Sequence, residues 1–131
     1  MVSEAEEAIE ATALLPKPVF DGHNDVLLRL WLGEKAGADP VAAFIGGESA
    51  GHIDLPRARK GGLAGGLCAV FVPSAGIFAL GQSGANGHYS TPMAAEVDQA
   101  TASAASAEII DLALRLESAG GWTICRSTGE I

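Results

Sequence analysis

His23 and Asp25 are the two residues of this sequence whose types and spacing could do chemistry. They follow Val19 and Phe20, an apolar pair that opens a predicted strand. Residues two apart in a strand point to the same side, so the imidazole and the carboxylate could meet above the strand's carboxyl end. Imidazole nitrogen and carboxylate oxygen are ligands of zinc and of other divalent first-row metals. The pair therefore predicts two metal ligands, and a solvated loop without metal is the alternative interpretation.

The residues around this pair must position it. Asp21 or Asn24 could orient the imidazole ring from behind the metal. The apolar residues that follow are spaced for one face of a helix, with Gly33 as its expected end: Val26, Leu27, Leu30 and Trp31. The pattern predicts strand, loop and helix, and the carboxyl ends of parallel strands are where barrel enzymes assemble their sites.

Further elements are predicted along the chain. Asp54 and Pro56 are typical of a helix start, and the Gly61-Gly62 pair would end that short helix. Residues 33–52 are rich in Gly and Ala and suggest an irregular connection. Residues 66–73 form a continuous apolar run, which is typical of a strand covered on both faces. A third short strand is expected at 122–125.

A long helix is predicted from Thr91-Pro92 to about Ser118. Its expected apolar face has residues spaced by three and four: Met93, Val97, Ala100, Ala104, Ala107, Ile110 and Leu114. The resulting order β-α-β-α-β predicts an α/β fold with a parallel sheet and crossover helices.

Both ends of the chain carry helix-start signals. Ser3 and Glu6 form a capping-box pattern that predicts a leading helix over 1–15. Residues 127–130 form a second capping box, so the chain stops where a helix should begin. We therefore expect residues 1–131 to be a single partial domain, the front part of a longer α/β protein, with a frayed polar tail as the alternative.

Composition limits the classes of function. With 16 acidic and 8 basic residues the net charge is −8, which makes nucleic acid an unfavourable partner. The acidic N-terminus does not resemble a secretory signal, and no apolar run reaches the roughly 18 residues of a membrane span. A soluble, cytoplasmic protein is expected. Cys68 and Cys125 lie in apolar runs and are expected to be buried thiols.

Several other polar residues are candidate site residues by their type alone. His52 precedes a predicted helix and is expected at the surface or behind the site, and His88 ends the long Gly/Ser-rich segment 74–90, which is expected to be a functional or mobile loop. Arg57, Arg59 and Lys60 are expected to form a solvated face. The glycine clusters match neither a nucleophile elbow nor a phosphate-binding loop.

Three segments resemble the membrane dipeptidase (renal dipeptidase) family of zinc metallopeptidases, which are amidohydrolase-like barrels. They are residues 19–28 (VFDGHNDVLL), 52–63 (HIDLPRARKGGL) and the run 66–73. The resemblance implies a zinc pair in a TIM-like (β/α)8 barrel, of which about three β/α units are present here, and hydrolysis of dipeptides by a metal-bridging hydroxide. It places His23 and Asp25 on the family's first-strand ligand positions. The family's other ligands, a Glu and two His, would lie beyond Ile131.

Three functions remain open from the sequence. The first is a zinc dipeptidase with a dipeptide as its partner and a homodimer as one possible assembly. The second is a catalytically incomplete fragment of that family, because two ligands cannot close a tetrahedral zinc site. The third is a non-enzymatic acidic α/β binding module. No catalytic residue besides the two metal ligands is assigned.

Overall fold

The first strand forms where the sequence predicts it. The computed structural model describes residues 17–75, 82–83, 89–90 and 93–131, and β1 spans Val19–Asn24 within them. Helix α2 follows at once as Val26–Lys35 and buries Val26, Leu27, Leu28 and Leu30. The helix passes through Gly33, so the predicted end there is wrong. It ends instead before Gly37, whose φ of 93° suits a residue without a side chain.

A helix that the sequence analysis missed comes next. Helix α3 spans Pro40–Gly46, within the segment predicted to be irregular. Asp39 caps it by accepting hydrogen bonds from the backbone N–H groups of Val41 and Ala42, both at 3.0 Å. The Asp-Pro signal is the same kind that correctly predicts α4, Leu55–Gly61, which Asp54 caps and Gly62 ends in the left-handed conformation.

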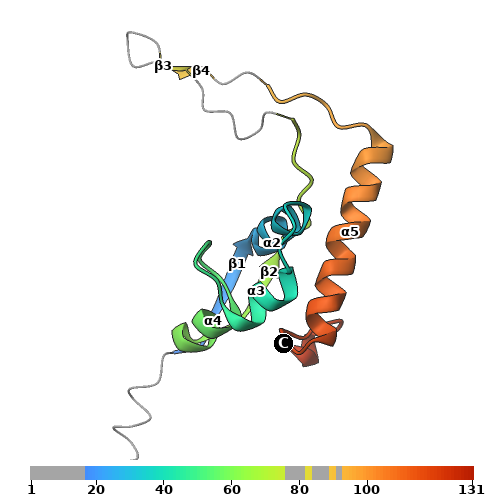
Figure 1. Ribbon diagram of the computed structural model, residues 1–131. Coiled ribbons are helices and arrows are strands. Elements are labelled where there is room, and N and C mark those ends of the chain that lie inside the picture. The colour runs from blue at the N-terminus through green and yellow to red at the C-terminus, as the bar shows by residue number, and fades with distance from the viewer. Residues whose placement is uncertain (1–16, 76–81, 84–88, 91–92) are drawn as a thin grey trace, which may run out of the picture.

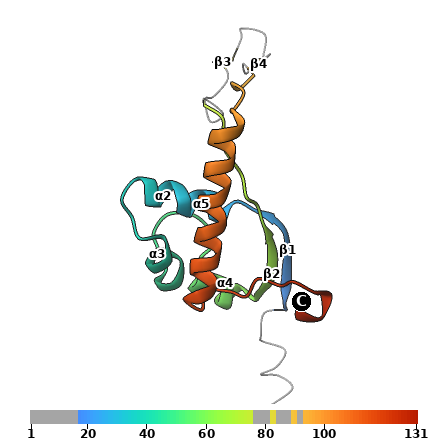
Figure 2. The ribbon, with the colours of Figure 1, turned by 90° about the vertical axis from the view of Figure 1, so that its right-hand side faces the viewer.

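The second strand pairs in parallel with the first, as predicted. Strand β2 spans Leu63–Cys68, so it starts and ends earlier than the predicted run 66–73. The expectation that both faces are covered is wrong for this chain, because Leu67 is 61% exposed and Cys68 is also exposed. Figure 2 shows α2, α3 and α5 to one side of the two strands, whereas, of the described residues, only the short C-terminal end of the chain lies beyond β1 on the other.

The long helix is shorter at its start than predicted. Helix α5 spans Gln99–Ser118 and is capped by Asp98, which accepts from the N–H of Thr101 at 2.9 Å. Residues 93–98 are not helical, and the predicted start at Thr91-Pro92 lies outside the described residues. The predicted face is also wrong, since Met93, Ile110 and Leu114 are exposed. The buried face consists of Ala105, Ile109, Leu112 and Leu116.

The third predicted strand is absent from the described residues. The segment 122–125 has no strand pairing. Its Trp122 packs against Phe44, with ring centroids 5.1 Å apart, and donates from Nε1 to the carbonyl of Ala113 at 3.1 Å. Trp122 therefore packs against helices α3 and α5 and not beside the strands. The other described pair of strands is antiparallel, β3 (Gln82–Ser83) with β4 (Tyr89–Ser90).

The apolar core lies between helices α2, α3 and α5, which Figure 1 shows near the two-stranded sheet. Its fully buried members are on α5: Ile109, Leu112 and Leu116. Both cysteines are exposed, so the expectation of buried thiols is wrong. None of the helices in the described ranges is long and apolar enough to cross a bilayer. The leading helix predicted over 1–15 lies outside those ranges.

The C-terminal capping box forms as predicted. The helix η1, a short 3-10 turn over Thr128–Glu130, follows Ser127, and the side chains of Ser127 and Glu130 each bond the other's backbone N–H.

Candidate metal centre

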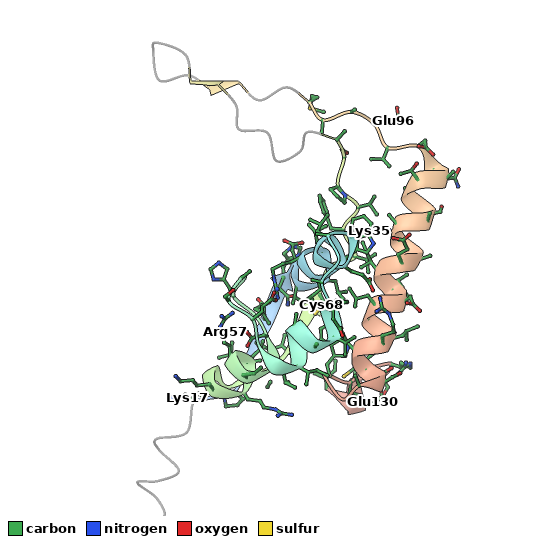
Figure 3. All side chains as sticks on the ribbon, viewed as in Figure 1. Lys17, Lys35, Arg57, Cys68, Glu96 and Glu130 are labelled. Carbon is green, nitrogen blue, oxygen red and sulfur yellow. The ribbon has the colours of Figure 1, made fainter. Side chains whose placement is uncertain are left out.

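The candidate site lies where β1 ends and α2 begins. Asn24 is in register with Cys68 at the end of β2, and the N–H of Ala69 donates to the carbonyl of Asn24 at 2.9 Å. The two parallel strands therefore end side by side, at the edge of a sheet where α/β proteins place their ligands. Figure 3 shows Cys68 at this strand end, next to α2.

The structure brings His23 and Asp25 together. Nε2 of His23 lies 3.5 Å from Oδ2 of Asp25, and the two side chains are 69% and 53% exposed. Two ligands that each lie about 2.0–2.2 Å from a tetrahedral zinc ion are separated by about 3.3–3.6 Å. The observed separation and the donor types therefore fit two ligands of one zinc ion.

The pair meets for a different reason from the one predicted. His23 is within β1, but Asp25 lies beyond the strand and is the N-cap residue of α2. The two side chains converge because the chain turns from strand to helix between them, and not because they share one face of a strand.

Asp25 is unusual among the aspartates that precede helices here. Its φ of −108° and ψ of 30° lie outside the extended region, and its side chain makes no capping hydrogen bond. Asp39, Asp54 and Asp98 are all extended at the same position, and each caps its helix. The carboxylate of Asp25 is thus not used by α2.

Asp21 and Asn24 do not orient the imidazole, contrary to the expectation. Asp21 accepts a hydrogen bond from Nδ2 of Asn24 through Oδ2 at 2.8 Å, and one from the N–H of His23 through Oδ1 at 3.4 Å. Asn24 accepts from the N–H of Val26 at 3.3 Å. In the described part of the chain both side chains therefore bond to each other and to the backbone, and neither bonds to the His23 ring.

Two residues of β2 complete the surroundings. A side chain at Gly66 would have its Cβ 3.2 Å from the Cβ of Asp21 and 3.3 Å from Nδ2 of Asn24, so this close approach favours glycine. Cys68 is exposed as a residue, but its thiol is partly enclosed, and this burial raises its pKa; Asp21 adds to the rise, while the Asn24 side chain opposes it. Neither residue was predicted as part of the site, although a Gly-Gly pair inside a strand is a signal for close approach.

The other candidate residues lie elsewhere. His52 is exposed before α4, which fits its expected place at the surface, and His88 lies outside the described residues. Arg59 and Lys60 are exposed as expected. Arg57 is not simply solvated, because its guanidinium donates to the carbonyls of Glu48 and Gly51 at 2.6 and 3.0 Å and pairs with Asp54. Figure 3 places Arg57 on the α4 side of the molecule.

The described residues place two candidate metal ligands, His23 and Asp25, at the end of β1. No group of three or more His, Cys, Asp or Glu side chains able to hold a metal ion occurs among the described residues. A tetrahedral zinc site needs four ligands, of which a catalytic site leaves one to water or substrate.

Comparison with solved structures identifies the architecture. A dipeptidase described as a metallopeptidase of family M19 matches with a TM-score of 0.73 and 32% identity over 87% of this chain and 32% of its own. A metallopeptidase from Rhodobacter sphaeroides, solved with a phosphinate mimic of the dipeptide L-Ala-D-Ala, matches with a TM-score of 0.72 and 28% identity over 88% of this chain and 33% of its own.

Sequence comparison adds one shorter match. An uncharacterised protein from the PQQ-III 3' region of Acinetobacter calcoaceticus is 54% identical over 56 residues, which are 43% of this chain and 17% of that protein. No family model matches the chain.

The chain is thus structurally similar to metallopeptidases of the M19 membrane dipeptidase family, and the predicted resemblance is confirmed. The α/β fold with parallel strands is similar to part of their TIM barrel. The chain spans about a third of the length of each solved structure.

Proposed function

We propose that this chain supplies the first-strand metal ligands, His23 and Asp25, of a zinc-dependent dipeptidase. The observation that carries the proposal is the 3.5 Å separation of Nε2 and Oδ2 at the carboxyl end of β1. The similarity to M19 metallopeptidases supports it from a second direction. When bound, zinc would lower the pKa of a coordinated water molecule towards neutrality and polarise the scissile carbonyl.

The protein's own groups have distinct tasks in this proposal. His23 offers a neutral nitrogen and Asp25 a negatively charged oxygen, so the pair lowers the charge of a divalent cation by one. Both side chains are more than half exposed, which leaves room for further ligands and for a substrate. Because α2 does not use the carboxylate of Asp25 as a cap, its oxygen atoms are free to bind a cation.

The proposed substrate class is a dipeptide. The relative from Rhodobacter sphaeroides was solved with a phosphinate mimic of L-Ala-D-Ala. A phosphinate resembles the tetrahedral species formed when water adds to a peptide carbonyl. L-Ala-D-Ala is therefore the first dipeptide to test with this chain, followed by L-Ala-L-Ala to measure stereochemical preference.

A second function is favoured by the incomplete ligand set. The described residues bring two metal ligands together, and the chain spans about a third of its solved relatives. In this second function, the chain binds zinc through His23 and Asp25 but does not hydrolyse dipeptides by itself.

Metal analysis and a hydrolysis assay separate the two functions. Zinc per chain is measured by elemental analysis after dialysis, and release of alanine from L-Ala-D-Ala is followed in the same preparation. His23→Ala is compared with His52→Ala, which removes an exposed imidazole away from the strand end. Zinc binding and hydrolysis that are lost only in His23→Ala support the dipeptidase. Zinc binding without hydrolysis supports the second function, and no binding at His23 refutes both.

A further inference from the structure

Asp21 and Asn24 form a hydrogen-bonded pair next to the two candidate ligands, with Asp21 before His23 and Asn24 between His23 and Asp25. One oxygen of Asp21 accepts from the N–H of His23, and the other accepts from Nδ2 of Asn24. The remaining oxygen of Asn24 accepts from the N–H of Val26. We call these two side chains the clamp. It fixes the backbone before His23, between the ligands, and after Asp25.

The clamp explains why Asp25 departs from the other helix caps. Aspartate before a helix normally adopts extended dihedral angles and accepts an N–H from the first turn, as Asp39, Asp54 and Asp98 do. Asp25, with φ of −108° and ψ of 30°, makes no such bond. The N–H of Val26, the first residue of α2, donates instead to the side chain of Asn24 at 3.3 Å.

The clamp rests on the bare backbone of Gly66 in β2. A Cβ at Gly66 would lie 3.2 Å from both the Cβ and the carbonyl oxygen of Asp21, and 3.3 Å from Nδ2 of Asn24. Such contacts are tighter than most Cβ atoms make, so a side chain at this position would press on both clamp residues. By contrast, a Cβ at Gly22 would meet nothing within 4 Å.

We propose that Asp21 and Asn24 are positioning residues that hold Asp25 out of the capping conformation and so keep its carboxylate beside His23. This inference rests on the proposed function, in which His23 and Asp25 bind zinc. It assigns the clamp no contact with the metal or with a substrate. Its effect is to set the geometry of the two ligands before a metal arrives.

Exchange of the two clamp residues tests the proposal. Asp21→Asn leaves one acceptor oxygen for two donors, and Asn24→Asp places two carboxylates against each other. The double variant D21N/N24D restores all three hydrogen bonds, because the amide at position 21 donates to the carboxylate at position 24. Overall composition and charge are those of the natural chain, so the double variant separates the pairing from the residues themselves.

Two measurements are made on each variant of the full chain. In the metal-free protein, NMR backbone chemical shifts of Asp25 report its φ and ψ. Competition with a chelator then gives the affinity for zinc. We expect each single variant to move the Asp25 shifts towards extended values and to weaken zinc binding about ten-fold or more. The double variant should return the shifts and bring the affinity to within about three-fold of the natural chain.

Gly66→Ala and Gly22→Ala supply an independent pair. Gly66→Ala should reproduce the single clamp variants, and Gly22→Ala should leave the Asp25 shifts and the zinc affinity unchanged. The proposal is overturned if the single variants leave Asp25 unmoved, or if the double variant is as impaired as the worse single one. If the natural chain binds no zinc, the proposed function fails, whereas the shifts of metal-free Asp25 still decide whether the clamp sets its conformation.

Discussion

Nε1 of Trp31 donates a 2.7 Å hydrogen bond to Oε2 of Glu108, 77 residues further along the chain. Nζ of Lys35 lies 2.6 Å from the same oxygen and 5.4 Å from the centre of the Trp31 ring. Figure 3 shows Lys35 at the end of α2 that faces α5. A single carboxylate thus connects the helix that starts at the candidate site to α5, the longest helix among the described residues.

The fold should lose stability in acid partly through Glu108. Its hydrogen bonds with Lys35 and then Trp31 hold the pKa of this carboxyl below its ordinary value of 4.5. A carboxyl whose pKa is lower in the folded chain stabilises the fold above its unfolded pKa, and this contribution is lost as the pH falls through the folded value. The free energies of unfolding of the natural chain and of Glu108→Gln, measured with urea, should therefore differ at neutral pH and converge below pH 4.5.

Glu96→Gln is the control for this experiment, since Glu96 lies in the exposed segment before α5. Its unfolding free energy should follow that of the natural chain at every pH. If the difference in unfolding free energy between the natural chain and Glu108→Gln does not change with pH, the role given to Glu108 is contradicted.

Leu112 and Leu114 should respond very differently to truncation. Leu112 is fully buried on α5, whereas Leu114, two residues away, is 44% exposed. Leu112→Ala should cost about 2–5 kcal/mol of unfolding free energy, because it removes buried surface and leaves a cavity. Leu114→Ala should cost less than about 1 kcal/mol. Chemical denaturation checks both, and a larger effect at Leu114 would restore the helix face that the sequence pattern predicts.

Asp54 should be more important for stability than the other aspartate that caps a short helix, Asp39. Asp54 is 1% exposed, caps α4 through the N–H of Arg57 at 2.9 Å, and pairs with the Arg57 guanidinium at 3.1 Å. Asp54→Ala should therefore cost about 2–3 kcal/mol, and Asp39→Ala about 1 kcal/mol. Thermal and urea unfolding measure both, and equal losses would show that burial of Asp54 adds nothing to its capping.

Local signals in the sequence are sufficient for much of this fold. The caps at Asp54 and Ser127 and the strand that leads to His23 all form as predicted. Helix α3 was also predictable, because Asp39-Pro40 is a cap followed by proline at the first helical position. The surrounding segment is rich in Gly and Ala, so large apolar residues do not show the helical spacing that would support this cap signal.

Features that depend on tertiary packing were not predictable. Ala, Ile and Leu occur on several sides of α5, so spacing by three and four fits more than one face, and only contact with α2 and α3 selects Ile109, Leu112 and Leu116. An apolar run also cannot distinguish a strand from a segment such as 122–125, whose Trp122 packs on Phe44. Exposure of Cys68 likewise follows from which elements lie beside β2.

The site shows the same division. The sequence predicts that His23 and Asp25 meet, and they do so. The turn from strand to helix that brings Asp25 to His23 does not follow from the spacing of the two residues. The approach of Gly66 to the clamp depends on a neighbouring strand that is distant in sequence. That these two side chains, His23 and Asp25, bind zinc remains a prediction.

A zinc titration followed by NMR tests that prediction most directly. Nitrogen-15 resonances of the imidazole rings and the side-chain carboxyl carbon of Asp25 are recorded as zinc is added to the metal-free chain. We predict that Nε2 of His23 and the Asp25 carboxyl carbon shift together and saturate, while the ring of His52, exposed and elsewhere on the surface, does not. An unchanged His23 ring, or equal responses of His23 and His52, would contradict the assignment of His23 and Asp25 as the first-strand zinc ligands.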